Sequence, residues 1–172
     1  DYTARTTKPS VVNLTDHAYF NLGGHGDVYG QILRIAASHY LPLDKLHLPT
    51  GRIAPVDATA YDWRAPRPLS TGEKRDDTGV RAGRGLKLAA TLRDPASGRR
   101  LAVRTTQPGL VVYTAGGFDG SLRDSAGEPL VAGAGVALET QGFPDAPNHD
   151  DFPSTVLRPG ETWRQTTVFD FN

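Results

Sequence analysis

The stretch GLKLAATLRDPASGRRLAVRTTQPGLVVYTA, residues 85–115, decides the fold class. Helix propensity favours a helix over Gly85 to Leu92, but the preceding glycine and the following turn DPASG favour a hairpin strand. The return strand is predicted over Arg100 to Thr106, where apolar and polar residues alternate as they do in a half-buried strand. A third strand is predicted over Gly109 to Ala115, after a second turn. Three strands with short turns indicate an antiparallel sheet.

The rest of the chain repeats this pattern. Further runs of β-branched and aromatic residues predict strands over Ile32 to Ala37, Gly135 to Thr140 and Thr162 to Phe171. The 19 glycines and 13 prolines are scattered along the chain, as frequent turns require. Long loops are expected at Leu41 to Arg67 and at Gln141 to Pro153, and loops of that size are usually functional or packed on themselves. The sequence therefore predicts one all-β domain, an antiparallel β-sandwich.

Composition excludes several classes of protein. The 172 residues carry 19 basic and 19 acidic side chains, so no basic face for a nucleic acid or an acidic membrane is expected. Without cysteine, neither a disulfide nor a thiolate metal site can form. No apolar run approaches the roughly 18 residues of a membrane helix. We expect a cytoplasmic protein, with secretion left open.

Two features of the composition bear on the source of the protein and on its N-terminus. Lysine occurs only at Lys8, Lys45, Lys74 and Lys87, and this excess of arginine points to a GC-rich, bacterial genome. The chain begins at Asp1 and contains no methionine, which predicts a processed or cut N-terminus.

A polar segment, VVNLTDHAYFNLGGHG, runs from Val11 to Gly26. If residues 11–22 are extended, alternate side chains share a face, and a polar comb faces away from the core. The comb consists of Asn13, Thr15, His17, Tyr19 and Asn21; the opposite face carries Val12, Leu14, Phe20 and Leu22. These hydrogen-bonding side chains favour a ligand surface about as strongly as an ordinary solvated sheet face.

Glu139 ends the apolar run GVAL and is either a solvated edge residue or a desolvated base, because burial raises the pKa of a carboxyl group. The other histidines, His25, His39 and His47, are typical of turns or strand ends. A metal site at His149 with its two neighbouring aspartates is disfavoured, since adjacent loop residues rarely all face one ion. Trp63 and Trp163 fit either sugar stacking or the core.

Two blocks together resemble the aldose 1-epimerases, also called galactose mutarotases. These are VNLTDHAYFNLGGHG and LETQGFPDAPNHDDFPSTVLRPGETW. The segments YLPLDKLHLPTGRIAPV, YDWRAPRPL and TTQPGLVVYT lie between them in the family's order. The resemblance implies an antiparallel galactose mutarotase-like supersandwich and the interconversion of α and β anomers of a hexose such as galactose or glucose.

By this resemblance, His17 is the general acid that protonates the ring oxygen, and Glu139 is the general base for the anomeric hydroxyl. Tyr19 and Gln107 match positions that contact the sugar. The ring opens, the C1–C2 bond rotates, and reclosure gives the other anomer. One proton donor and one acceptor suffice for this reaction, so we expect a small aldose as the partner and neither a metal nor a cofactor.

The resemblance covers only the C-terminal half of the family's length. Residues 1–172 are therefore expected to be the C-terminal portion of one sandwich domain, with the N-terminal half absent and a second chain or that half needed to complete it. The family's sugar-binding aspartate segment should fall between Val80 and Leu88, and no trace of it is found there. A non-catalytic sugar-binding protein, an inactive epimerase-like fragment and a structural domain without a site remain alternatives.

Overall fold

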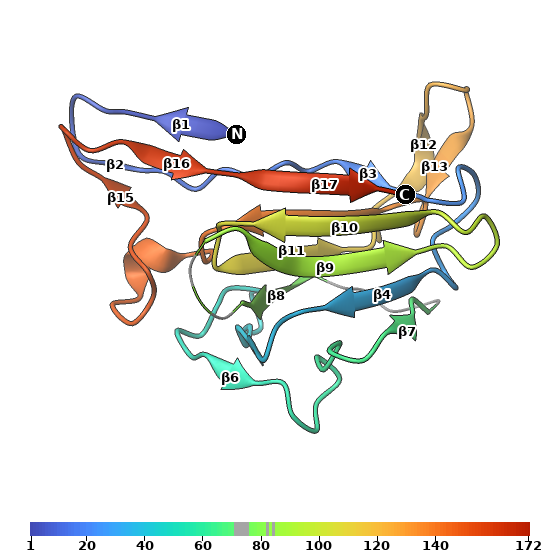
Figure 1. Ribbon diagram of the computed structural model, residues 1–172, viewed down its shortest axis with the longest axis horizontal. Helices are drawn as coiled ribbons and strands as arrows, with labels where there is room; N and C mark the ends of the chain where they lie inside the picture. Colours follow the sequence, from blue (N-terminus) through green and yellow to red (C-terminus); the bar gives the residue numbers. More distant parts are fainter. Residues whose placement is uncertain (71–75, 82, 84) are drawn as a thin grey trace.

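The computed structural model describes residues 1–70, 76–81, 83 and 85–172, and within them the chain is built from antiparallel strands (Figure 1). The described part contains no α-helix, only the 3₁₀ turn η1 (Ala146–Asn148). None of its helices is long and apolar enough to cross a membrane. The all-β class expected from the sequence is confirmed.

Two main sheets form the body of the molecule. The five-stranded sheet has the order β17 (Thr167–Phe171), β10 (Arg100–Thr105), β9 (Lys87–Arg93), β4 (Ile32–Ile35), β7 (Arg67–Pro68). The six-stranded sheet has the order β3 (Tyr19–Phe20), β14 (Val136–Gln141), β11 (Gly109–Tyr113), β8 (Asp76–Val80), β5 (His39–Tyr40), β6 (Ala54–Pro55).

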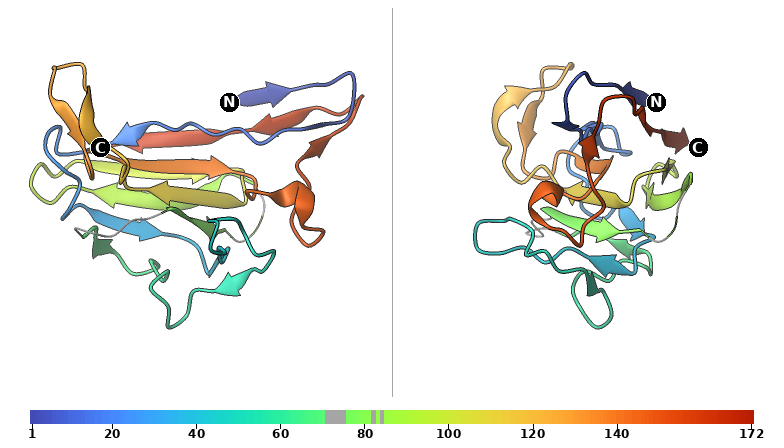
Figure 2. Two further views of the ribbon diagram at one scale, coloured as in Figure 1. Left: turned by 180° about the vertical axis from the view of Figure 1, so that it is seen from behind. Right: turned by 90° about the vertical axis from the view of Figure 1, so that its left-hand side faces the viewer.

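Three two-stranded sheets lie outside this body. They pair β1 (Tyr2–Ala4) with β16 (Trp163–Gln165), β2 (Ser10–Val11) with β15 (Val156–Leu157), and β12 (Asp119–Arg123) with β13 (Pro129–Val131). The β12–β13 hairpin projects beside the C-terminal end of β17, and β1 and β16 extend above the opposite end of the body (Figures 1 and 2).

The hydrophobic core lies between the two main sheets. Alternate side chains of each strand enter it, as the two-residue period of a strand requires. Leu33 of β4 and Val103 of β10 come from one sheet, Val112 of β11 and Leu138 of β14 come from the other, and all four are fully buried. This alternation fixes which residues of β11 and β14 face outward, and the outward face carries the site described below.

The predicted hairpin is confirmed. Strand β9 pairs antiparallel with β10, and Leu92 faces Leu101 across the pair. The prediction of one strand over Thr162 to Phe171 is wrong. The run divides at Thr166, whose backbone N–H binds the Thr106 hydroxyl, so β16 pairs with β1 while β17 pairs with β10.

The extended conformation considered for residues 11–22 is found only in part. Only Ser10–Val11 and Tyr19–Phe20 are strands, and no ladder joins them. Between them the Asp16 carboxylate accepts a hydrogen bond from the N–H of Ala18 at 2.9 Å, an Asx turn that competes with sheet pairing. Leu14, predicted to lie in the core, is 44% exposed.

The long segment from Leu41 to Arg67 is not a loose loop. It contains β6 and an isolated bridge between Leu43 and Pro49. Trp63 is 1% exposed and belongs to the main core, with the Arg67 guanidinium 3.6 Å from the centre of its ring. Of the two roles left open for this tryptophan, the structure shows the core.

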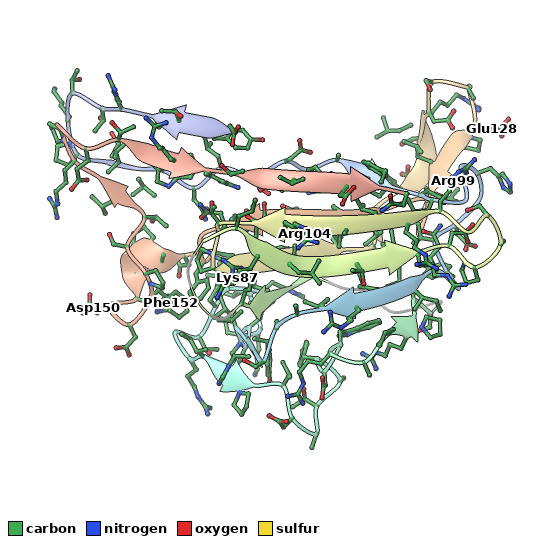
Figure 3. All side chains as sticks on the ribbon, in the orientation of Figure 1. Lys87, Arg99, Arg104, Glu128, Asp150 and Phe152 are labelled. Carbon is green, nitrogen blue, oxygen red and sulfur yellow. The ribbon has the colours of Figure 1, made fainter. Side chains whose placement is uncertain are left out.

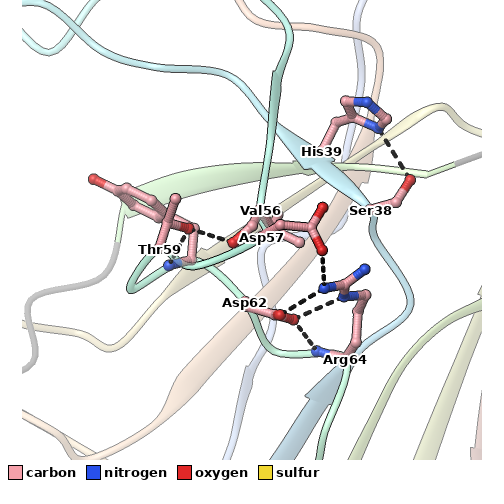
Figure 4. A network of polar contacts seen from close by, with 8 residues as sticks. Ser38, His39, Val56, Asp57, Thr59, Asp62 and Arg64 are labelled. Carbon is pink, nitrogen blue, oxygen red and sulfur yellow. Dashed lines mark hydrogen bonds and ion pairs between the residues drawn. The ribbon is translucent and has the colours of Figure 1, made fainter.

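The same segment contains an ionic cluster on its surface (Figure 4). Arg64 binds Asp57 at 2.7 Å and holds Asp62 through both its guanidinium and its backbone N–H. The hydrogen bonds from Arg64 lower the pKa of Asp62 to about 2. Charge-assisted bonds of this kind favour the ionised carboxylate.

We expect the Asp62 carboxyl to titrate near pH 2 in an NMR pH series, and Arg64→Ala to move that midpoint up toward 3.8. Because the folded pKa lies below the unfolded value, this carboxylate contributes stability above about pH 4 that is lost as the pH falls toward 2. A midpoint that does not respond to Arg64→Ala would contradict the assignment.

Candidate active site

Glu139 lies on β14, the strand next to the outer strand β3 of the six-stranded sheet, and on the sheet's outer face. In β14 the side chains of Val136 and Leu138 enter the core. Glu139, the next residue along the strand, therefore points to the opposite face. Its neighbours across the sheet are Val111 of β11 and, beyond it, Thr78 of β8. The carboxylate is therefore mounted on a strand that pairs with β11, and its side chain is only 10% exposed.

His17 reaches the same face from the segment that leads into β3. Its Nε2 lies 3.3 Å from Oε1 of Glu139, and its side chain is 48% exposed. The Asx turn at Asp16 sets the direction of the chain at this point, and the β3 pairing of Tyr19 with Ala137 holds the segment against β14. Residues 122 positions apart in sequence thus form one contact.

Aromatic rings surround this contact on one side. The ring of Tyr19 lies 5.0 Å from that of His17, and Tyr113 of β11 lies 6.3 Å from His17. Phe118 packs on Tyr19 at 5.0 Å. Burial first, then the nearby Tyr113 and Glu139, raise the pKa of the Tyr19 hydroxyl, so this phenol stays a neutral hydrogen-bonding group. The cluster gives the site an apolar flank beside its ionisable pair.

A pocket of about 270 Å³ opens beside the pair. It is lined by His17, Leu43, His47, Pro49, Thr78, Val111, Glu139, Gln141 and Pro144. The floor comes from β8, β11 and β14, whereas the walls come from two loops, one between β5 and β6 and one after β14. A volume of this size fits a small polar molecule better than an extended polymer.

The two wall-forming loops are packed on each other. The loop after β14, on which Figure 3 labels Phe152, shares a small core with Leu41 of the other segment, and in it Phe143 meets the ring of Phe152 at 5.1 Å. His149 of this loop lies 3.2 Å from Asp145 and presses against Gly51 of the other loop. A Cβ on Gly51 would lie 2.7 Å from Nδ1 of His149, and the glycine has a φ of +81°. Only glycine satisfies both demands.

The polar comb predicted over residues 13–21 is not a ligand surface as a whole. Asn13 exchanges hydrogen bonds with the backbone of Gly142, which ties the segment to the end of β14. Asn21 donates to the carbonyls of His25, Gly26 and Ala134. Both amides thus serve mainly backbone groups, whereas His17 and Tyr19, two of the five residues of the comb, lie in the aromatic and acidic cluster.

Gln107 is buried in the turn between β10 and β11, where its backbone N–H binds the Thr105 hydroxyl and its backbone carbonyl accepts from Nε of Arg81. It is not among the residues that line the pocket. The geometry thus brings together His17, Tyr19 and Glu139, and the contact of Gln107 with sugar stays a prediction.

In the part of the chain that the structure describes, no group of three His, Cys, Asp or Glu side chains could hold a metal ion. His149 pairs with Asp145 and packs on the Phe152 ring, and neither adjacent aspartate is part of that arrangement.

The sequence did not single out Thr78, which lines the pocket, or Tyr113, whose ring lies beside His17, and it did not assign His47 to the site. Thr78 is in β8, which was not predicted because its DDTGV run lacks apolar alternation. Tyr113 was placed in a strand, but its outward direction follows only from the register with Ala137. The signal for these residues is a property of the assembled sheet and not of any local motif.

Comparisons with known proteins place the chain in a family. The family model for aldose 1-epimerase matches residues 1–170. Over the whole chain, identity is 41% to the galactose mutarotase of Rattus norvegicus and 38% to that of Homo sapiens, and over 99% of the chain it is 34% to the aldose 1-epimerase of Escherichia coli. The chain covers 53% of each of these relatives, so it spans about half their length.

In the alignment with the rat protein, the sequence of the present chain contains internal gaps. It runs over 183 residues against the 172 here, and 183 − 172 = 11, so at least 11 aligned positions have no counterpart in this chain. A missing internal segment, predicted between Val80 and Leu88, is compatible with that difference. Residues 82 and 84 of this segment lie outside the described residues.

Solved structures show the same relation. A GalM/aldose epimerase homologue from C. elegans has a TM-score of 0.87 at 29% identity and covers 99% of this chain and 54% of its own. A galactose 1-epimerase from Lactobacillus acidophilus has a TM-score of 0.81 at 26% identity, with 99% and 51% covered. With its family match, its relatives and its fold in agreement, the chain belongs to the aldose 1-epimerase family.

Proposed function

We propose that this chain carries the proton-transfer pair of an aldose 1-epimerase, which interconverts the α and β anomers of a hexose such as galactose or glucose. The observation that carries the proposal is the 3.3 Å contact between His17 and Glu139 at the edge of a small pocket. The family membership and the relatives named mutarotases support the same activity.

In the proposed reaction His17, as imidazolium, gives a proton to the ring oxygen, while Glu139 takes the proton of the anomeric hydroxyl. The C1–ring oxygen bond breaks and C1 becomes an aldehyde. After rotation about the C1–C2 bond, the hydroxyl formed from the ring oxygen attacks the other face of C1. His17 recovers its proton from that hydroxyl and Glu139 returns its proton to the aldehyde oxygen, so both residues regain their starting states.

The placement of the pair suits this chemistry. Both oxygens are bonded to the same carbon, so an acid and a base that serve them must lie close together, as His17 and Glu139 do. Histidine titrates near neutral pH and can serve as donor and acceptor in turn. The low exposure of Glu139 removes competing water from the base, whereas the more exposed His17 stays open to the arriving sugar.

A second candidate is a sugar-binding protein without catalysis. The observation that favours it is the openness of the site, since the His17 side chain is 48% exposed and the pocket is small. The chain also spans about half of its relatives. Calorimetry that shows aldose binding without any acceleration of mutarotation would support this second function over the first.

The first test is the optical rotation of freshly dissolved α-galactose. The protein is expected to speed the approach to anomeric equilibrium, and His17→Ala is expected to reduce the enzymatic rate roughly 10²–10⁴-fold, the usual contribution of a general acid. His25→Ala, in the exposed glycine turn that follows β3, serves as the control and should retain the wild-type rate. Equal rates for wild type and His17→Ala would exclude the proposed mechanism.

We also propose that further strands complete the sandwich, supplied by a second chain or by a preceding half. Strand β17 is the outer strand of its sheet and carries Val168 and Phe171, which are 38% and 58% exposed. Such an edge invites pairing. Intact-mass measurement of the native complex tests this, because a species of 18.5 kDa alone would contradict it.

A cytoplasmic location and a bacterial source, expected from composition, stay predictions. The relatives include mammalian and bacterial proteins alike.

A further inference from the structure

The β5–β6 loop carries a tight hairpin turn whose geometry is well defined. The N–H of His47 binds the carbonyl of Asp44 at 3.1 Å, and the N–H of Asp44 binds the carbonyl of Leu48 at 2.8 Å. The Asp44 carboxylate also accepts from the N–H groups of Leu46 and Leu48. This is a three-residue hairpin loop in which a turn is followed by one residue in the left-handed region.

His47 occupies that left-handed position, with a φ of 61°. Glycine is the residue that such a position normally takes, because a Cβ is crowded there. The hydrogen bonds that hold the loop come from the backbone and from Asp44, and none of them uses the imidazole. The loop therefore has no structural need for histidine at this position and would be less strained without its side chain.

The His47 side chain nevertheless lies at the pocket. His47 is exposed and lines the pocket of about 270 Å³ together with His17 and Glu139. Thr78 and Gln141 line the same pocket, so its walls offer neutral hydrogen-bonding groups beside the ionisable pair. Backbone strain at a residue that faces a site is a recognised sign of function, since strain persists where the side chain contributes something else.

We propose that His47 is a sugar-binding residue, which hydrogen-bonds a hydroxyl group of the aldose other than the two oxygens on C1. The role goes beyond proton transfer, because His17 and Glu139 already serve both oxygens on the anomeric carbon. An imidazole can donate to one hydroxyl or accept from it, and its position on the loop wall makes it a determinant of which aldose is held. The inference rests on the proposed function for the choice of an aldose as ligand.

The test compares His47→Gly and His47→Asn with the wild type in the full-length protein. Glycine relieves the strain, so the Tm is expected to stay level or rise, while the Kd for galactose measured by calorimetry rises roughly 3- to 10-fold, the worth of one hydrogen bond. The KM should rise by the same factor with kcat nearly unchanged. Asparagine tolerates the left-handed region and keeps a donor and an acceptor, so it should restore much of the affinity.

Deoxy sugars identify the hydroxyl. For the aldose that lacks the contacted group, His47→Gly should cause no further loss of affinity, whereas the loss should persist for the other deoxy sugars. A purely structural role of His47 would weaken the binding of all these sugars alike and would show no such coupling between the side chain and one hydroxyl.

Several results would overturn the inference. Wild-type affinity in His47→Gly would do so, and so would a lowered Tm, which would show that the loop depends on the imidazole. A wild-type protein that binds no aldose would also reject it. A wild type that binds galactose but does not accelerate mutarotation would reject the proposed enzymatic function alone, and the affinity comparison would still decide the role of His47.

Discussion

Glu139→Gln is expected to lower kcat for mutarotation roughly 10²–10⁴-fold, the contribution of a positioned general base. Glutamine has nearly the same shape as glutamate, so β14 keeps its pairing with β11 and the pocket keeps its volume. What is lost is the ability to accept the proton of the anomeric hydroxyl, since a neutral amide is a very weak base. The initial rate of change in optical rotation, measured by polarimetry at saturating galactose, gives kcat directly.

The matched control for this substitution is Glu161→Gln. Glu161 is exposed, accepts a hydrogen bond from the N–H of Arg158, and is not among the residues that line the pocket. The same chemical change there should leave kcat within twofold of the wild type, roughly the reach of a surface substitution. A Glu139→Gln variant that turns over at the wild-type rate would remove the carboxylate from the mechanism.

Trp63→Ala is expected to reduce the free energy of unfolding by about 3–5 kcal/mol, the range for deleting a large buried aromatic side chain. Trp63 is 1% exposed, packs in the main core, and supports the Arg67 guanidinium on its ring. Its backbone carbonyl also accepts from the N–H of Ile35, a hydrogen bond that alanine can keep, so the expected loss comes from the ring. Urea unfolding followed by circular dichroism measures the loss.

Trp163→Ala provides the comparison. Trp163 lies in β16, in one of the peripheral two-stranded sheets, and is only partly buried. The same truncation should cost clearly less there because less of the ring is removed from a packed interior. Equal losses at the two tryptophans would show that Trp63 does not anchor the core.

The sequence predicted the elements that depend on local chemistry. The β9–β10 hairpin follows from alternation on both sides of a turn, and β11 and β14 follow from continuous apolar runs. It did not predict β8, whose side-chain pattern is weak and whose strand character comes from pairing with β11 and β5. The break at Thr166 was also missed, because a change of sheet leaves no mark on the alternation.

The same distinction holds for the site. His17 and Glu139 were reached by resemblance, and only register and direction show that they touch. The comb around His17 is not a ligand surface as a whole, because the Asn13 and Asn21 side chains bind backbone groups. The alternation of polar residues does not reveal such backbone contacts. His47 was interpreted as a strand-end residue, since its pocket position depends on the hairpin turn that presents it.

The two members of the pair differ in how firmly they are mounted. Glu139 is fixed by a strand paired with β11, whereas His17 lies just before β3 in a stretch held mainly by the Asp16 turn and the hydrogen bonds of Asn13 to Gly142. In the proposed reaction the rotation about C1–C2 changes the position of the aldehyde oxygen, while the former ring oxygen stays bonded to C5. The firmly held carboxylate must therefore reach the aldehyde oxygen both before and after the rotation, whereas the less firmly held imidazole serves one oxygen throughout. The sugar, and not the base, then makes the movement that exchanges one anomer for the other.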